Sequence, residues 1–309
     1  MTSTSLVVRA LAEHEARELF TSLHDPASAL LGPPLTGRPY ATAATGGVYR
    51  PEWTWVALRG GVVVARAAFF GAPGDTEPVV LDWFDFTDRA AAVELLRRLP
   101  WRVGYELMLP PDWRRQSGVR AAAEARVEAA EAAGYTFVVE RLRYTWTPEC
   151  GLPERPGRLE FRPVPDGGEG EEAVLDVLRR VHSATLDAHA RLAIAGGGVE
   201  RAAREELEYF RWCSSPRSWW RLAYTPEGAP VGLHVPVLIP AGPCVGFVGV
   251  LPGQRGHGYA YDLLAECTHQ LAAEGAESIV AATDVTNAPM AAHFARAGYP
   301  VEQHRVCLR

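Results

Sequence analysis

A short glycine-containing segment is the clearest chemical feature of the sequence. Its residues are Arg255-Gly256-His257-Gly258-Tyr259-Ala260, and the apolar run Val245–Leu251 before it predicts a strand. After it, apolar residues recur on one face of a predicted helix, at Leu263, Leu264, Cys267 and Leu271. The unpaired N–H groups of a helix N-terminus attract phosphate oxygens, and glycine allows the backbone to curl those groups inward. The segment therefore predicts a binding site for a diphosphate.

This segment also resembles a known motif. The acyl-CoA loop of the GCN5-related N-acetyltransferase (GNAT) superfamily has the pattern Arg/Gln-x-x-Gly-x-Gly/Ala, which Arg255, Gly258 and Ala260 meet. A second element, Asn287–Tyr299, resembles the strand-to-helix segment that flanks pantetheine and the leaving sulfur in that superfamily. The resemblance implies acetyl-CoA, or a related acyl-CoA, as co-substrate, with its diphosphate on the loop amides. It implies these cofactor-binding residues: Val248, Val250, Arg255, Gly256, His257, Gly258, Tyr259, Ala260 and Asn287.

The reaction that the resemblance implies is attack of an acceptor amine on a thioester carbonyl. The carbonyl oxygen needs a hydrogen-bond donor, which the resemblance assigns to a backbone N–H near Val250. In the superfamily a tyrosine four residues before the glycine at position 298 often protonates the leaving sulfur, but this sequence has Phe294 there. Either another group protonates the sulfur, or CoA leaves as a thiolate. The alternative interpretation is a catalytically silent acyl-CoA-binding or interaction module.

The acceptor ammonium must lose a proton, which requires a general base or a chain of water molecules. His234, on the strand after a predicted hairpin, is the first candidate, and Asp187, after the first helix of the second half, is the second. His182 and His189 lie seven residues apart and would share a helical face, and Asp284 ends a predicted strand. The acceptor itself stays open among small amines, amino acid derivatives and peptides.

The sequence follows one plan twice. Each half begins with a strand and a helix, continues with a hairpin and an apolar strand before another helix, and ends a later helix with Ala-Gly-Tyr, at 133–135 and 297–299. Pro148–Gly157 is rich in proline and glycine, as linkers are. We therefore expect an α/β (α+β) protein with two tandem GNAT-like domains, at 1–150 and 158–309. Each would be a mixed, mostly antiparallel sheet flanked by helices.

The first half lacks the glycine loop. Its strand Val79–Phe86 leads into a helix without glycine, and carboxylates stand at Asp82, Asp85 and Asp88. Because these charges would repel a diphosphate, we expect this half to bind no CoA and to serve a structural role or to wall the acceptor site. The second half has room for only one strand after its last helix. Phe137–Trp146, or a dimer partner, would fill the gap in its sheet.

Composition narrows the classes of partner. The net charge is −6 at pH 7, and all 31 basic residues are arginine, which excludes catalysis through a lysine amine. An acidic chain is a poor ligand for nucleic acid or an anionic membrane. The sequence has no apolar run of about 18 residues, no signal-peptide pattern and five scattered cysteines. We therefore expect a cytoplasmic monomer or homodimer, without a metal site, that acts on a small-molecule or peptide amine.

Overall fold

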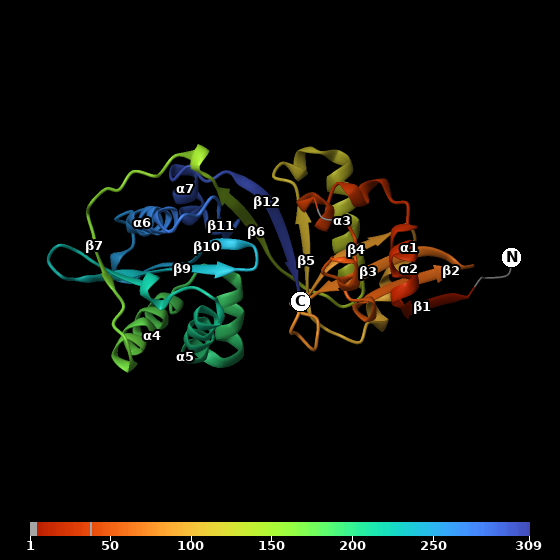
Figure 1. Ribbon diagram of the computed structural model, residues 1–309, viewed down its shortest axis with the longest axis horizontal. Coiled ribbons are helices and arrows are strands. Elements are labelled where there is room, and N and C mark those ends of the chain that lie inside the picture. The colour runs from red at the N-terminus through yellow and green to blue at the C-terminus, as the bar shows by residue number, and fades with distance from the viewer. Residues whose placement is uncertain (1–4, 38) are drawn as a thin grey trace. The chain divides into compact units, whose positions relative to one another are not determined.

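The structure, a computed structural model, describes residues 5–37 and 39–309. The chain forms two compact units, each with its own set of strands and its own hydrophobic core (Figure 1). The first unit runs as far as Glu140 and also includes Gln303–Arg309, whereas the second is Arg141–Glu302. The unit boundaries therefore do not follow the order of the sequence, since the last residues belong to the first unit.

The first unit is a sheet with three helices. Its strands follow the order β1-β2-β3-β4-β5-β12, and all neighbours pair antiparallel except β4 and β5. The strands are β1 (Leu6–Ala10), β2 (Thr54–Arg59), β3 (Val62–Phe70), β4 (Val80–Phe86), β5 (Gly104–Leu109) and β12 (Val301–Leu308). The helices are α1 (Glu13–Thr21), α2 (Arg89–Arg98) and α3 (Ser117–Ala132).

The second unit repeats this plan, as the sequence predicts. Its strands follow the order β6-β11-β10-β9-β8-β7, with β10 and β11 as the parallel pair. The strands are β6 (Phe137–Trp146), β7 (Glu160–Pro163), β8 (Arg221–Tyr224), β9 (Pro230–Ile239), β10 (Gly242–Val250) and β11 (Ile279–Asp284). The helices are α4 (Gly168–His182), α5 (Ala188–Trp212), α6 (Tyr259–Ala273) and α7 (Ala288–Arg296).

Each unit completes its sheet with a strand from the other half of the sequence. Strand β12, at the end of the chain, pairs with β5, and Leu308 lies opposite Tyr105. Strand β6 pairs with β11, and Trp146 lies opposite Ile279. The gap that the sequence leaves in the second sheet is therefore filled by Phe137–Trp146. A cut at the linker would separate β6 from β11 and β12 from β5, so experiments require the intact chain.

The parallel pair of the second unit separates almost at once. Strands β10 and β11 are paired only at Cys244 and Val280, although β10 continues to Val250 and β11 to Asp284. A bulge lies between Val245 and Phe247 in β10. The backbone of the last residues of β10 is therefore paired with β9 on one side and free of β11 on the other. This is the opening in which the sequence places the thioester.

The first unit has the same separation, but its own chain lies in it. Strands β4 and β5 are paired only from Val80 to Leu81. Beyond that point the Gly32 N–H donates to the Met108 carbonyl of β5 at 2.8 Å, and a Cβ built on Gly32 would lie 4.0 Å from the Asp82 carbonyl of β4. Gly32 has a φ of 71°, a backbone conformation that favours glycine. The segment around Gly32 therefore bridges the two strands.

The helix predicted to carry both His182 and His189 is in fact two helices. Helix α4 ends at His182, and α5 begins after Asp187, whose side chain accepts a hydrogen bond from the Ala190 N–H and so caps the new helix. His182 and His189 therefore lie on different helices and share no helical face. Helix α5 is itself broken at Gly198, which has a φ of 81°.

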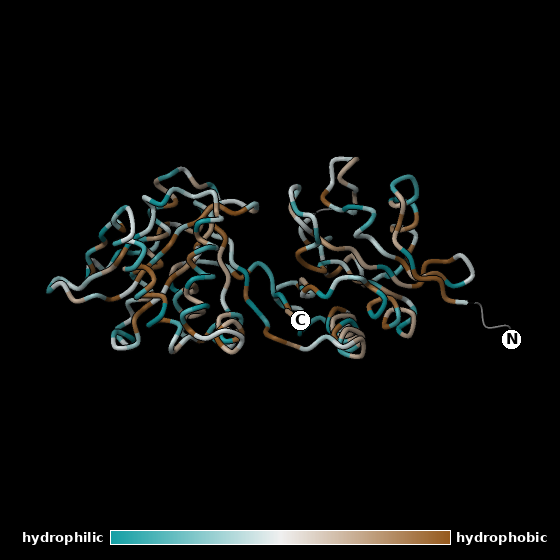
Figure 2. The backbone as a smooth tube through the Cα atoms, turned by 90° about the horizontal axis from the view of Figure 1, so that it is seen from below, coloured by the Kyte–Doolittle hydropathy of each residue, from teal (hydrophilic) through white to brown (hydrophobic). Residues whose placement is uncertain are grey.

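The five cysteines are free thiols. Among the described residues, no helix has the length and apolar character needed to cross a membrane. Figure 2 agrees, since hydrophilic and hydrophobic stretches alternate along the backbone of both units.

Candidate functional site

The loop before α6 presents a run of unpaired backbone N–H groups. Gly256 and Gly258 have φ values of 88° and 78°, and Gly258 stands at the N-cap of α6. Within the described part of the chain, no hydrogen bond involves the backbone N–H groups of residues 256–260. A left-handed glycine beside a helix N-terminus turns successive N–H groups toward one point, where an anion is stabilised. The loop therefore has the donors that a diphosphate requires.

Arg255 does not extend from this loop as a free cation. Its guanidinium donates to the carbonyl of Ala184 at 2.6 Å and approaches the carbonyls of Val181 and Val250 at 3.5 and 3.3 Å. These contacts tie the loop to the end of α4 and to the end of β10. The resemblance implies that Arg255 binds the cofactor; in the structure its side chain holds the loop in place, and the unpaired donors of the loop are backbone N–H groups.

A second arginine, distant in sequence, lies beside the loop. Arg158 donates to the His257 carbonyl at 2.8 Å and forms a two-pronged ion pair with Asp262, with Nε at 3.1 Å from Oδ1. Asp262 is 3% exposed and lies in the first turn of α6, whereas Arg158 is 41% exposed. The Arg158 guanidinium also lies 5.3 Å from the centre of the Tyr259 ring. Arg158 therefore neutralises a buried carboxylate at the helix end that is to receive an anion.

The other residues predicted to bind the cofactor lie along the same strand, loop and helix. Val248 pairs with His234 on β9, and Val250 is the last residue of β10. The His257 ring stacks on Tyr259 at 5.4 Å. Ala260 follows in the first turn of α6. Asn287 caps α7, with its side chain accepting from the Met290 N–H at 3.4 Å, so its amide oxygen has a structural partner.

The turn between α4 and α5 spans the opening between β10 and β11. On one side Arg255, just after β10, holds the Ala184 carbonyl. On the other side Asp284, at the end of β11, accepts a hydrogen bond from the Ala188 N–H at 2.7 Å. Residues 184–188 are therefore tied to both walls of the opening. A group bound on this turn would face a thioester held between the strands.

Carboxylates gather at this turn. Arg141 lies 3.2 Å from Asp284 and 3.7 Å from Asp187. Burial and the charge of Asp187 raise the pKa of Glu206, on α5, to about 7, while Arg141 opposes that rise. Burial also raises the pKa of Asp284. Asp187 does not pair with Arg191, whose Nε donates to the Thr185 carbonyl. The sequence gives no sign of Glu206 or Arg141, because they meet Asp187 only through the fold.

The two buried histidines have no polar partners. His234 is fully buried, neither ring nitrogen has a hydrogen-bond partner among the described residues, and burial lowers its pKa to about 3. A base must reach the proton that it removes, so the structure gives no support to the first sequence candidate. His182 is 4% exposed and is also unpartnered. Burial lowers the pKa of His182, whereas the negative charge of Asp187 partly raises it again.

Phe294 is enclosed between aromatic rings. It is 2% exposed, stacks on Tyr144 of β6 at 4.4 Å and meets Tyr299 edge-on at 5.3 Å. The position at which the resemblance expects a proton donor is therefore apolar. His293, its neighbour on α7, has a pKa lowered by burial.

The corresponding helix of the first unit differs at its N-terminus. Asp88 caps α2, its Oδ1 accepting from the Ala91 N–H at 3.0 Å, and the same carboxylate pairs with Arg59. Asp85 is buried between Arg66 and Arg126, each at 2.7 Å. The anion position at this helix end is thus already held by a side chain of the protein.

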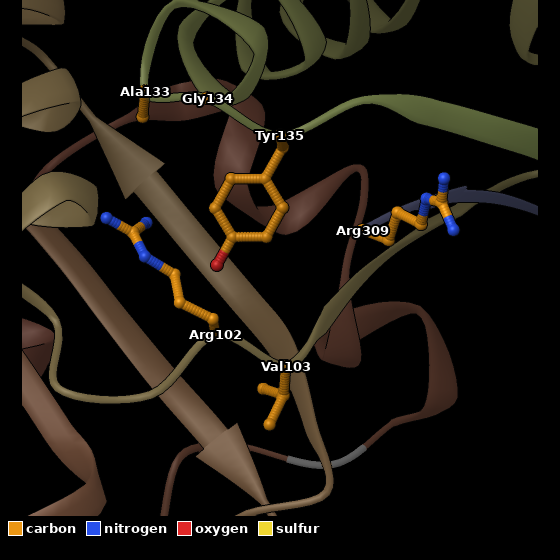
Figure 3. A pocket seen from close by; sticks show the side chains of 6 residues that line it. All are labelled: Arg102, Val103, Ala133, Gly134, Tyr135 and Arg309. Atoms are coloured by element: carbon orange, nitrogen blue, oxygen red, sulfur yellow. The ribbon is translucent and has the colours of Figure 1, made fainter. Parts of the chain in front are cut away.

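A cavity of about 290 Å³ lies elsewhere in the first unit (Figure 3). Figure 3 shows the Tyr135 hydroxyl directed toward the side chain of Arg102, and the side chain of Arg309 on the other side of that ring. Arg102 approaches the carbonyls of Leu96 and Arg97, at 3.4 and 3.3 Å, and so contacts the end of α2. None of its six lining residues has a carboxylate or imidazole side chain.

Solved structures share this architecture. A GCN5-related N-acetyltransferase from Sphaerobacter thermophilus superposes with a TM-score of 0.56 at 18% identity, over 98% of this chain and 94% of its own. The glucosamine N-acetyltransferase region of a fungal multi-domain GH3 β-N-acetylglucosaminidase gives a TM-score of 0.53 at 11% sequence identity, over 100% of this chain and 38% of its own. A tandem GNAT protein from the clavulanic acid biosynthesis pathway gives a TM-score of 0.48 at 16% sequence identity, over 98% of both chains. The first two of these structures show that the fold is that of the GNAT acetyltransferases.

The sequence comparison names the family. Residues 188–299 match the model of the acetyltransferase (GNAT) family, a segment that runs from the start of α5 to the Tyr299 that follows α7. Over this segment the second unit of the chain is therefore similar to the GNAT family. No curated protein has a significantly similar sequence.

Proposed function

We propose that the second unit transfers an acetyl or another short acyl group from CoA to an amine of a small molecule, an amino acid derivative or a peptide. The observation that carries this proposal is the run of unpaired N–H groups at residues 256–260, beside the opening between β10 and β11. These donors suit the diphosphate of acetyl-CoA, and Val248 and Val250 lie where the acyl arm would enter the opening.

The reaction joins two groups and releases one. The amine nitrogen bonds to the thioester carbon, the carbon–sulfur bond breaks, and the amine loses a proton that ends on CoA sulfur or in water. A backbone N–H of β10 near Val250 would stabilise the oxyanion, because β11 leaves that edge unpaired. Buried Phe294 has no proton to give, so we propose that CoA departs as a thiolate.

We propose Asp187 as the general base. Asp187 lies on the turn that spans the opening between β10 and β11. Its Oδ1 caps α5, and its Oδ2, which lies 3.7 Å from Arg141, remains able to accept a proton. Asp187→Asn is a suitable test, because asparagine caps helices as well as aspartate does but is not a base at neutral pH. We expect kcat to fall by about 100-fold, with little change in the Kd for acetyl-CoA.

Two measurements on the intact chain test the proposed function. Calorimetry should show one molecule of acetyl-CoA bound per chain, and free thiol should appear when protein, acetyl-CoA and a panel of amines are mixed. Binding without thiol release above background would favour a silent acyl-CoA-binding module, a reading that the apolar position 294 also suits. An absence of acetyl-CoA binding would refute both.

A further inference from the structure

The turn between α4 and α5 (residues 183–187) is attached to the second unit by side chains from two other elements. Arg255, in the loop before α6, donates to the Ala184 carbonyl at 2.6 Å, and Asp284 of β11 accepts from the Ala188 N–H at 2.7 Å. The backbone hydrogen bond from the Ala184 N–H to the Val181 carbonyl is longer, at 3.2 Å. Residues 183, 184 and 186 are exposed, and residues 185 and 187 are half-buried. The position of the turn therefore depends on these side-chain ties more than on burial.

Arg255 joins this turn to the loop at which we propose that the diphosphate binds. Its guanidinium also lies 3.5 Å from the carbonyl of Val181, in the last turn of α4, and 3.3 Å from that of Val250. A cation is favourable at the C-terminal end of a helix, and hydrogen bonds from a charged donor are stronger than those from a neutral one. The next residue, Gly256, begins the run of backbone N–H groups that are unpaired within the described part of the chain. A shift of this loop would therefore move the side chain that holds the turn.

A second arginine binds the same turn from another direction. Arg191, in the first turn of α5, donates from Nε to the Thr185 carbonyl at 2.9 Å. The two arginines thus bind the carbonyl groups of neighbouring residues by the same chemistry. Arg191 ties the turn to the helix that follows it, whereas Arg255 ties it to the loop before α6. Arg191 is therefore a matched control for the role of Arg255.

We propose that Arg255 is a positioning residue that couples the donor loop to the turn that carries Asp187. This inference rests on the proposed function, in which the diphosphate of CoA binds the loop and Asp187 acts on the acceptor. A diphosphate on the N–H groups of residues 256–260 fixes the backbone of the loop, and through Arg255 it fixes the Ala184 carbonyl. Asp187 follows three residues later, so it is held most firmly at the opening when CoA is bound. Because linkage is reciprocal, an ordered turn strengthens the binding of CoA by the same factor.

Hydrogen–deuterium exchange, followed by mass spectrometry on the intact chain, measures this coupling with CoA as the probe. In the wild type, saturating CoA should slow exchange of the amides of residues 183–188 by about fivefold or more, the low end of couplings between two sites. The hairpin turn at 225–228, in the same unit, should keep its rate and so reports any general stabilisation. Arg255→Ala, at a CoA concentration that saturates this variant, should reduce the slowing to about twofold or less. Arg191→Ala should exchange faster with and without CoA but should keep the slowing.

The outcomes separate the coupling from the proposed function. Equal slowing in Arg255→Ala and the wild type, or bound CoA that leaves the wild-type turn unchanged, would overturn the coupling while leaving the donor site intact. Loss of the slowing in Arg191→Ala as well would show that any tie on the turn suffices, and would also overturn it. If Arg255→Ala is unfolded or binds no CoA, Arg255→Gln, which keeps a side-chain N–H donor, takes its place with the same expected loss. A wild-type protein that binds no CoA by calorimetry would refute the proposed function, and the coupling with it.

Discussion

Removal of the Arg158 side chain should weaken the binding of CoA indirectly, because it leaves the carboxylate of Asp262 without its partner. Arg158 pairs with Asp262, which is almost fully buried in the first turn of α6. Without its partner, Asp262 would place a negative charge beside the helix end at which we propose that the diphosphate binds. Two unit charges about 8 Å apart interact by about 2 kcal/mol at an effective dielectric constant of about 20. Arg158 is partly exposed, so solvent and salt reduce this figure.

The expected result for Arg158→Ala is a Kd for CoA raised by about 10- to 30-fold, since about 1.4 kcal/mol corresponds to tenfold. The double variant Arg158→Ala with Asp262→Asn removes both charges and should return the Kd to within about threefold of the wild-type value. Arg155→Ala is the matched control. It removes an arginine of the same segment that pairs with Glu266 of the same helix, and should leave the Kd unchanged.

Calorimetry with CoA at low and high salt measures these effects, and thermal unfolding checks that each variant is folded. The loss in Arg158→Ala should shrink as salt rises, because screening weakens the exposed repulsion. If the double variant bound CoA as weakly as Arg158→Ala does, Arg158 would have to contact the phosphate directly or shape the loop. An unchanged Kd in Arg158→Ala would refute the whole electrostatic argument.

Three further changes test other parts of the site. Gly258→Val forces a β-branched residue to a φ of 78° and should raise the Kd for CoA at least about tenfold. The control Gly253→Ala places a Cβ in open space in the same loop and should leave the Kd unchanged. Equal affinities of the two variants for CoA would exclude this loop as the CoA-binding site. Phe294→Tyr should raise kcat if protonation of sulfur limits the rate; an unchanged kcat would show that it does not. Burial, and after it the charge of Asp187, raises the pKa of Glu206 to about 7, so the free energy of unfolding should fall as pH rises from about 5 to 7; Glu206→Gln should flatten this part of the profile, and an unchanged profile would count against the shift.

The sequence was sufficient for features whose causes are local. The glycines at 256 and 258 and the apolar periodicity after them define a strand, loop and helix within about 30 residues, and the structure has these elements, with a strand that begins three residues before the predicted start. The duplicated plan is likewise visible in the order of elements. The division between α4 and α5 was missed, although Asp187 followed by a helical run is a capping signal that could have indicated it.

The remaining features depend on contacts that no local pattern encodes. Arg158 meets Asp262 across 104 residues, and Arg255 reaches Ala184 across 71, so neither role can be inferred from spacing. The sequence suggested Arg255 as the cation of the loop because its type and position fit. Carbonyl groups at the end of α4 compete for the same guanidinium and bind it in the structure.

The two units show how small the difference is between a helix end that can bind an anion and one that cannot. Helix α6 begins after Gly258, which has no side chain to satisfy the first N–H groups, whereas α2 begins after Asp88, whose carboxylate accepts from the Ala91 N–H. In the first unit the Gly32 segment also donates to β5 where the strands separate. Side-chain and main-chain groups of the protein thus occupy both positions that a CoA diphosphate and its acyl arm would need. We therefore propose a single donor site, in the second unit, and the expectation that the first half binds no CoA rests on these internal contacts more than on repulsion by its acids.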